Sequence, residues 1–135
     1  MRTEDLMIGD WVRIIDDDTD AYFDARIEGI DVLANIYATM PCDETAYPYS
    51  VDCAQPIPLT PEILEKNFQE FLPGINLMYQ LKGPYCAMNE DGQWVFGLVK
   101  VDGEKSARYP LVKISFVHEL QHALRLCGIT KEIQI

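Results

Sequence analysis

The sequence predicts an α+β protein: an N-terminal SH3-like small β-barrel, then a helix, an antiparallel sheet, and a C-terminal helix and strand. Residues 8–54 hold short apolar runs of period two between closely spaced turn residues, as in small barrels. A proline-rich joint follows, and period two then returns before one 3.6-residue pattern near the C-terminus. We expect residues 1–57 to form the barrel subdomain and residues 58–135 an α+β subdomain, joined in one compact folding unit.

Four short runs are predicted as the strands of the barrel. Residues 8–15 begin with a Gly-Asp turn and continue into β-branched and aromatic residues. Residues 25–32 alternate apolar and polar side chains, so this run should pair back on the first. Residues 34–40 and 49–54 are the third and fourth strands, with a loop at 41–48 between them.

The acidic segment from Asp16 to Asp20 connects the first two strands. Its alternate aspartates match the first three ligand positions of an EF-hand calcium loop. The match then fails, because Ala21 replaces the required glycine and Ile27 replaces the bidentate glutamate. We therefore interpret the segment as a solvated hairpin tip.

A helix is predicted to begin at Pro61, with Thr60 as its N-cap and Glu62 near the positive end of the helix dipole. Pro73-Gly74 should end it. Its apolar stripe consists of Leu64, Phe68, Phe71 and Leu72. We interpret the stripe as core, with a groove for a partner helix as the alternative.

The remaining pattern predicts an antiparallel meander closed by a helix and a strand. The predicted strands cover residues 75–82, 85–88, 94–101 and 111–116, with Asp-Gly turns at 89–92 and 102–104. Trp94 and Phe96 share one face and are expected in the core. The last helix should run from Ser115 as N-cap to Gly128 as C′ residue, and residues 129–135 alternate as a closing strand.

The charge and cysteine content limit the classes of function. Twenty-two acidic and 11 basic residues give a formal charge of −11, which disfavours binding to nucleic acid or to anionic membranes. The first residues lack a signal-peptide pattern and no apolar run is long enough to span a membrane, so we expect a cytoplasmic protein. The four isolated cysteines are expected as small buried side chains; they are Cys42, Cys53, Cys86 and Cys127.

The most conspicuous motif is His-Glu-x-x-His, formed by His118, Glu119 and His122. Two histidines four residues apart on a helix can share a zinc ion, and the glutamate can act as general base on a metal-bound water. Catalytic zinc also needs a third protein ligand. With only two histidines in the chain, that ligand must be a cysteine or a carboxylate, and the upstream acids leave this open.

Other features argue against the zinc interpretation. Helical geometry places His118, Gln121, His122 and Arg125 opposite the apolar arc, where the charge of Arg125 would oppose a dication. Glu132, the sole acid downstream, should point away from both histidines. Glu119 lies in the first turn, where a carboxylate favours the helix dipole without catalysis.

Three motifs together resemble a family of uncharacterised proteins from gut bacteria, their phages and integrated mobile elements. They are Ile-Gly-Asp-Trp-Val at residues 8–12, Pro-Ile-Pro-Leu-Thr at 56–60, and Val-His-Glu-Leu-Gln-His at 117–122. In that family the last motif typically reads His-Glu-Leu-Gln or His-Gln-Leu-Gln followed by Asn, so His122 is a departure. The resemblance implies no activity, and it suggests that His-Glu-x-x-His arose here by chance.

We therefore assign no catalytic, metal-binding or cofactor-binding residue from the sequence. The expected function is a non-enzymatic accessory or protein-interaction module of phage or mobile-element type, with an unknown protein partner and no membrane association. The alternative is a zinc-dependent hydrolase that uses His118, Glu119 and His122. A weaker alternative is an acidic inhibitor that mimics nucleic acid, which rests on the charge alone.

Overall fold

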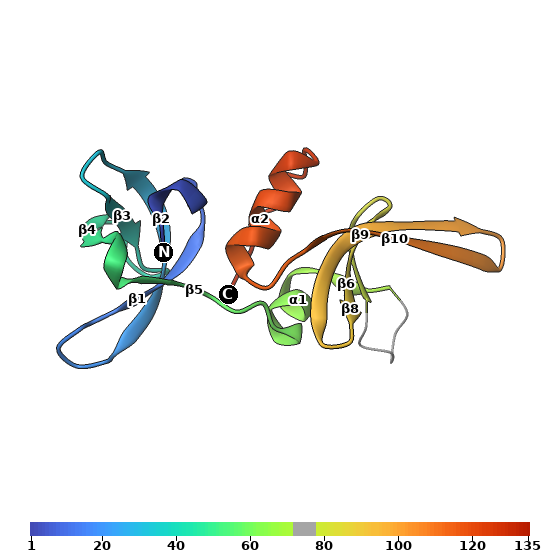
Figure 1. The fold of residues 1–135 in the computed structure, drawn as a ribbon, viewed down its shortest axis with the longest axis horizontal. Helices are drawn as coiled ribbons and strands as arrows, with labels where there is room; N and C mark the ends of the chain where they lie inside the picture. Colours follow the sequence, from blue (N-terminus) through green and yellow to red (C-terminus); the bar gives the residue numbers. More distant parts are fainter. Residues whose placement is uncertain (72–77) are drawn as a thin grey trace. The chain divides into compact units, whose positions relative to one another are not determined.

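A computed structural model describes residues 1–71 and 78–135, and the chain divides into two compact units, Met1–Ile57 and Pro58–Ile135. Figure 1 shows that strands dominate both units. Within the described residues each unit contains one five-stranded antiparallel sheet, and the second also contains two α-helices. The predicted α+β class is confirmed.

The first unit is an antiparallel sheet in the order β4-β3-β2-β1-β5. Its elements are η1 (Thr3–Asp5), β1 (Trp11–Ile15), β2 (Tyr22–Ile30), β3 (Asn35–Thr39), β4 (Tyr47–Ser50), η2 (Val51–Cys53) and β5 (Ala54–Pro56). The predicted pairing of the first two strands is confirmed. The sheet is open, because in the described part of the chain no strand pairing joins β4 to β5, so the predicted closed barrel is not confirmed.

The strand predicted at residues 49–54 is wrong in its middle, which is the 3-10 turn η2. The hydroxyl of Ser50 accepts the N–H of Asp52 at 3.3 Å and caps this turn. Side-chain bonds of this kind offer the backbone an alternative to a strand ladder. The chain therefore leaves β4, turns, and re-enters the sheet as β5 beside β1.

The Gly-Asp pair before β1 has a structural role. Gly9 has a φ of +92°, a conformation that side chains rarely adopt, and its N–H donates to Ile27 O at 2.7 Å. Asp10 is fully buried, and its carboxylate accepts the N–H of Met7 at 2.7 Å. These contacts set the point at which β1 enters the sheet.

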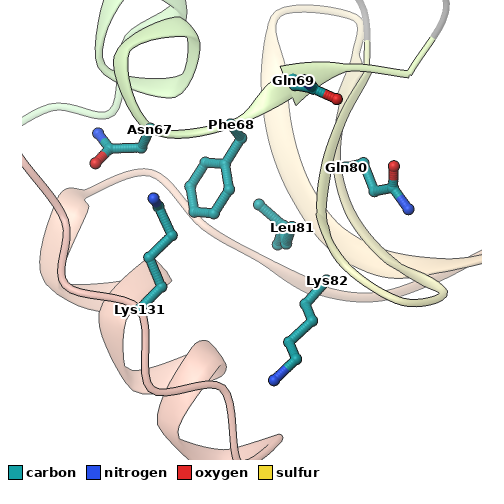
Figure 2. A pocket seen from close by; sticks show the side chains of 7 residues that line it. All are labelled: Asn67, Phe68, Gln69, Gln80, Leu81, Lys82 and Lys131. Atoms are coloured by element: carbon teal, nitrogen blue, oxygen red, sulfur yellow. The ribbon is translucent and has the colours of Figure 1, made fainter.

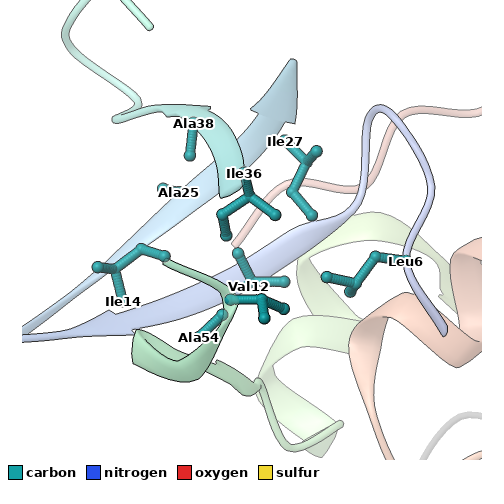
Figure 3. Close-up of a cluster of buried hydrophobic side chains, with 9 residues drawn as sticks. Leu6, Val12, Ile14, Ala25, Ile27, Ile36, Ala38 and Ala54 are labelled. Carbon is teal, nitrogen blue, oxygen red and sulfur yellow. The ribbon is translucent and has the colours of Figure 1, made fainter. Parts of the chain in front are cut away.

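Apolar side chains from η2 and four strands form the core of the first unit, joined by Leu6 from the segment before β1 (Figure 3). The buried set is Leu6, Val12, Ile14, Ala25, Ile27, Ile36, Ala38, Val51 and Ala54. Trp11 is buried as well. The alternation of buried and less buried residues along β1 to β3 follows the period of two read from the sequence.

The acidic segment is the exposed tip of the β1–β2 hairpin, as predicted. Asp16 N–H donates to Ala21 O at 2.8 Å, which closes the tip. The carboxylate of Asp16 accepts the N–H of Asp18 at 2.9 Å, and Asp20 has a φ of +55°. Aspartate favours such turns because its short side chain bonds the nearby backbone.

The second unit is built on an antiparallel sheet in the order β10-β9-β8-β7-β6, and β7 to β10 form the predicted meander. Its elements are α1 (Pro61–Asn67), β6 (Gln69–Glu70), β7 (Met78–Lys82), β8 (Tyr85–Glu90), β9 (Gln93–Asp102), β10 (Lys105–Lys113) and α2 (Val117–Leu126). Trp94 and Phe96 are buried, as expected; the rings of Tyr79 and Trp94 lie 5.9 Å apart, and those of Tyr85 and Phe96 stack at 5.6 Å.

Helix α1 begins as predicted, with Thr60 Oγ1 accepting the N–H of Ile63, but it ends earlier. The backbone of Phe68 is extended, and Gln69–Glu70 pairs with β7, so the predicted stripe beyond Leu64 is not helical over Phe68 and Phe71. Sheet pairing overrides local helix propensity here. The expectations for Leu72, Pro73-Gly74 and residues 75–77 lie outside the described residues.

Residues 129–135 do not form the predicted closing strand. The side chain of Asn67 pairs with this segment instead: its Nδ2 donates to Gln134 O and its Oδ1 accepts the N–H of Gln134, both at 2.7 Å. The Asn67 amide thus satisfies the backbone C=O and N–H of Gln134, which a neighbouring strand would otherwise bond. Ile129 and Ile133 are still buried, so the apolar alternation was correct although the strand was not.

Strand β10 begins at Lys105, six residues before the predicted start of the fourth meander strand. Residues 105–108 pair only with residues 99–102 of β9, so this part of the hairpin extends beyond β8. The sequence did not predict this part of β10, because its first residues are polar and do not alternate with apolar ones. A bulge lies between Pro110 and Val112.

Candidate interaction surface

Helix α2, which carries His-Glu-x-x-His, begins one residue later than predicted, with Phe116 as N-cap. One carboxylate oxygen of Glu119 accepts the N–H of Ser115 at 3.0 Å and the N–H of Phe116 at 3.1 Å. This is the glutamate half of a capping box, in which an acid at the third helical position satisfies exposed backbone donors. The contacts give Glu119 a structural role.

Gly128 is the C′ residue of α2, as predicted, and the helix ends in a Schellman motif. Gly128 has a φ of +72°, and its N–H donates to Arg125 O at 3.0 Å. The N–H of Ile129 donates to Leu124 O at 2.8 Å, which completes the motif. Both ends of the helix are therefore set by local sequence.

The polar side of α2 differs from the prediction. His118 and Gln121 are each only 7% exposed, although the helical pattern placed both opposite the apolar arc. The His118 ring stacks on Phe116 at 5.9 Å and contacts the edge of the His122 ring at 5.6 Å. The helical period correctly grouped these side chains, but polarity was a poor guide to their burial.

No third metal ligand is found beside the two histidines in the described ranges. Within residues 1–71 and 78–135, no group of three or more His, Cys, Asp or Glu side chains could hold a metal ion. Glu132 is exposed. The zinc interpretation therefore rests on His118 and His122 alone.

A groove of about 210 Å³ lies between α2 and the end of β10. Its lining residues are Val112, Lys113, Ile114, Glu119, His122, Ala123 and Leu126. The motif thus contributes His122 and Glu119 to a largely apolar groove. Sequence reasoning missed this groove, because it assigned residues 111–116 to a strand and did not predict which residues of α2 lie beside that strand.

Large apolar side chains are exposed on α2 and β10, and two of them, Val112 and Leu126, line this groove. Leu126 is 89% exposed on α2, while Tyr109, Leu111 and Val112 on β10 are 49%, 56% and 50% exposed. Together with the groove they form what we call the β10–α2 surface. Clustered exposed apolar side chains with a polar rim are typical of binding sites.

Strand β10 is an edge of its sheet, and all nine of its residues are exposed. Pro110 has no N–H to donate, and the bulge after it interrupts the regular backbone. Natural sheets use these features to prevent edge-to-edge pairing. The side chains of β10, more than its backbone, are therefore available to a partner.

The charge of β10 is opposite to that of the whole chain. Lys105, Arg108 and Lys113 lie on this strand, and no acidic residue occurs between Lys105 and His118. The chain as a whole has a charge of −11. The β10–α2 surface thus carries basic side chains from β10 together with Glu119, which lines the groove.

A second groove, of about 280 Å³, lies elsewhere in the second unit (Figure 2). It is lined by Asn67, Phe68, Gln69, Gln80, Leu81, Lys82 and Lys131. The Lys131 ammonium lies 5.6 Å from the centre of the Phe68 ring, and the amide of Asn67 is bonded to backbone. These polar groups already have structural contacts within the unit.

The cysteines are four free thiols, and only Cys86 is buried as predicted for all four. Burial raises the pKa of the Cys86 thiol to about 11, which keeps it protonated and unreactive. Cys42 is exposed, whereas Cys53 and Cys127 are partly exposed. The expectation of buried cysteines was wrong for these three.

No family model matches this sequence, and comparisons with curated proteins and with solved structures gave no match. In the described residues, no helix is long and apolar enough to cross a membrane. Function must therefore be argued from the surface of the molecule.

Proposed function

We propose that this protein is a non-enzymatic interaction module that binds a protein partner through the β10–α2 surface. The observation that carries the proposal is the exposure of Val112 and Leu126 in the lining of a largely apolar groove, with Tyr109 and Leu111 exposed on the same strand as Val112. Burying such side chains against a partner contributes about 25 cal/mol per Å² of apolar area. Exposed apolar side chains that gather at a groove are typical of protein interaction sites.

The test is affinity capture from a lysate of the organism that encodes the protein, with the wild type and a Val112→Lys/Leu126→Lys variant as baits. We expect a protein retained by the wild type and lost with the variant. Val32→Lys/Leu33→Lys is the matched control, because these two residues are 100% and 79% exposed in the first unit. Equal retention by both variants would contradict the proposal.

The architecture of the first unit adds weaker support. We propose that it is related to SH3-like barrels, since its last strand returns beside its first in the order β4-β3-β2-β1-β5. Small β folds of this kind often serve in binding. The membership in a phage or mobile-element family also remains a proposal, based on the three motifs in residues 8–12, 56–60 and 117–122.

A second candidate function is mimicry of nucleic acid by the first unit. That unit has 13 acidic and 3 basic residues, a formal charge of −10, whereas the second has 9 and 8, a charge of −1. Concentration of charge in one unit could produce the field that such a mimic needs. Capture of nucleic-acid enzymes that salt releases would favour this candidate over the interaction module.

The zinc hydrolase remains the alternative from a different class. It uses His118 and His122 as ligands and Glu119 as base, although Glu119 caps α2. Elemental analysis of the purified protein beside a His118→Ala/His122→Ala variant tests it. Stoichiometric zinc that disappears in the variant would favour the hydrolase over the interaction module.

A further inference from the structure

We propose that the turn between β2 and β3 is a preformed anchor that inserts Val32 and Leu33 into an apolar pocket of a partner protein, and that basic residues border this pocket. The turn consists of residues 31–34. The inference goes beyond the proposed function, because it concerns a separate surface that belongs to the first unit. It follows from the exposure, the backbone and the charge of the turn.

Two adjacent apolar side chains are exposed to solvent at this turn. Val32 is 100% exposed and Leu33 is 79% exposed. Turns are usually formed by Gly, Pro, Asn, Asp or Ser, which favour the turn backbone or bond to it. Val32 and Leu33 do neither, and side chains this exposed add little buried area to the fold. Burial in a partner's pocket would give both side chains the apolar surroundings that the fold does not.

Side-chain hydrogen bonds fix the start of the turn. The Asp31 carboxylate accepts the N–H of Leu33 at 2.8 Å and the N–H of Asn35 at 3.0 Å. The side-chain amide of Asn35 donates to the same carboxylate at 3.2 Å. The backbone N–H of Asp31 donates to Asn35 O at 3.0 Å, which closes the turn. An anchor that is ordered before binding loses less conformational entropy when it binds.

Tertiary contacts fix the end of the turn at Ala34. This residue has a φ of +62°, in the left-handed region that glycine adopts at lower cost. Its C=O accepts the N–H of Val51 at 3.1 Å, and its side chain packs against the core of the first unit. These contacts offset the cost of the backbone conformation. The turn therefore presents Val32 and Leu33 on a backbone that is held at both ends.

The charged residues that adjoin the turn are acidic. Asp31 lies within it, and Asp52 directly follows Val51, whose N–H donates to Ala34. The next charged residue back along β2 is Glu28. A pocket with basic residues at its border would complement these carboxylates.

The basic side chains of the first unit do not offset this charge. All of residues 1–57 are described, and each of the three basic side chains among them lies near a carboxylate. The pairs are Arg2 with Asp5 at 3.3 Å, Arg13 with Asp24 at 2.9 Å, and Arg26 with Glu28 at 3.3 Å. The formal charge of −10 on this unit disfavours an anionic membrane or a nucleic acid as the occupant.

The experiment places a photo-crosslinking amino acid, p-benzoylphenylalanine, at position 33 of the full-length protein in the organism that encodes it. The same amino acid at position 47 is the control, because Tyr47 is an exposed residue of β4 in the same unit. We expect light to join position 33, but not position 47, to one protein. Mass spectrometry should place the linked residue in an apolar pocket that is bordered by Lys or Arg.

Binding of that purified partner then tests the two side chains. Val32→Ser/Leu33→Ser should weaken the affinity at least about tenfold, because both anchors lose their apolar area. Tyr47→Ser is the control and should stay within about threefold. The affinity of the wild type should fall as the ionic strength rises.

NMR relaxation tests the preformed backbone in the free protein. The amides of Val32 and Leu33 should have order parameters of about 0.85, typical of a rigid backbone. Values below about 0.6 would show a flexible turn and would overturn the preformed anchor.

Other results would overturn the inference as a whole. They are the absence of a crosslink specific to position 33, a crosslink to lipid, nucleic acid or a second copy, and a linked pocket with an acidic border. None of them bears on the β10–α2 surface, which is judged by proteins lost with Val112→Lys/Leu126→Lys. In that capture, a protein lost only with Val32→Lys/Leu33→Lys would belong to the turn.

Discussion

Each unit has a five-stranded sheet in the described part of the chain, and the two units differ in how side-chain hydrogen bonds hold the segments around that sheet. In the first, carboxylates at turns bind nearby backbone: Asp10 accepts the N–H of Met7, and Asp31 accepts those of Leu33 and Asn35 at 2.8 and 3.0 Å. In the second, Asn67 reaches a segment 67 residues away. Part of the acidity of the first unit is therefore used to form turns, since aspartate is among the best turn residues.

The largest expected effect on stability comes from replacing a glycine in the second sheet, Gly97, and it contrasts with the same replacement at Gly29 in the first sheet. A Cβ on Gly97 in β9 would overlap Met88 Cε and would lie 2.6 Å from Tyr109 O, whereas one on Gly29 in β2 would only touch Tyr37 at 3.8 Å. We expect Gly97→Ala to lower the free energy of unfolding by about 3 kcal/mol. Gly29→Ala should change it by less than about 1 kcal/mol. Urea denaturation followed by circular dichroism measures both, and similar values would contradict the described packing around Gly97.

The next effect tests the long-range bond of the second unit. Asn67→Ala removes two hydrogen bonds to Gln134 and one to Ile63 O, so we expect a loss of about 2 kcal/mol in unfolding free energy. Hydrogen exchange at the Gln134 amide should accelerate in the same variant. Gln69→Ala, at an exposed neighbour, is the control and should stay within about 0.5 kcal/mol. An unaltered exchange rate at Gln134 would contradict the pairing.

A third effect appears only in alkali. Burial, and secondarily the carboxylate of Glu65, raises the pKa of Tyr79 from 10.0 to about 12. The folded protein therefore holds this proton more tightly than the unfolded chain. The resulting stabilisation is complete below pH 10 and is lost as the pH rises through 12.

The measurement uses a Trp11→Phe background and compares unfolding with and without Tyr79→Phe across this pH range, followed by the fluorescence of Trp94, whose ring lies 5.9 Å from that of Tyr79. The variant should lose less stability in alkali. Tyr109→Phe, at an exposed tyrosine, should behave as the Trp11→Phe protein does. Identical alkaline profiles for all three proteins would disprove the role of Tyr79.

The smallest effect belongs to the first unit and appears in acid. Hydrogen bonds, first from the backbone of Asn35, lower the pKa of Asp31 below its usual 3.8. The stabilisation is present above that ordinary value and is lost as the pH falls through the lowered one. Asp31→Asn should reduce the acid dependence of stability slightly, whereas Glu44→Gln, which removes the same charge, should not. A carboxyl titration of Asp31 by NMR at its ordinary pKa would contradict the prediction.

The sequence predicted features whose causes are local. Thr60, Gly128 and the Asp-Gly turns act through bonds within a few residues, and each lies at the expected helix end or turn. By contrast, α1 ends early because Gln69–Glu70 pairs with β7, and residues 129–135 are held by Asn67. Both contacts join residues that are distant in sequence. No residue pattern near Asn67 indicates that Gln134 will lie beside it.

The candidate site was harder to predict for the same reason. Both faces of β10 are exposed, so its residues lack the contrast of buried and exposed positions that reveals a strand. The burial of His118 and Gln121 likewise depends on tertiary structure, which a helical period alone cannot supply. The His-Glu-x-x-His motif can be recognised directly in the sequence. The exposure of Leu126, four residues after His122, cannot be predicted from it.

The buried tryptophans have a consequence for the physical study of the chain. The sequence contains two, Trp11 in the first unit and Trp94 in the second. Tryptophan emission shifts when a buried indole meets water, so Trp94→Phe leaves a reporter for one unit and Trp11→Phe a reporter for the other. Two coincident transitions would mean that the units unfold as a single cooperative system. Separated transitions would mean that either unit can open while its neighbour stays folded.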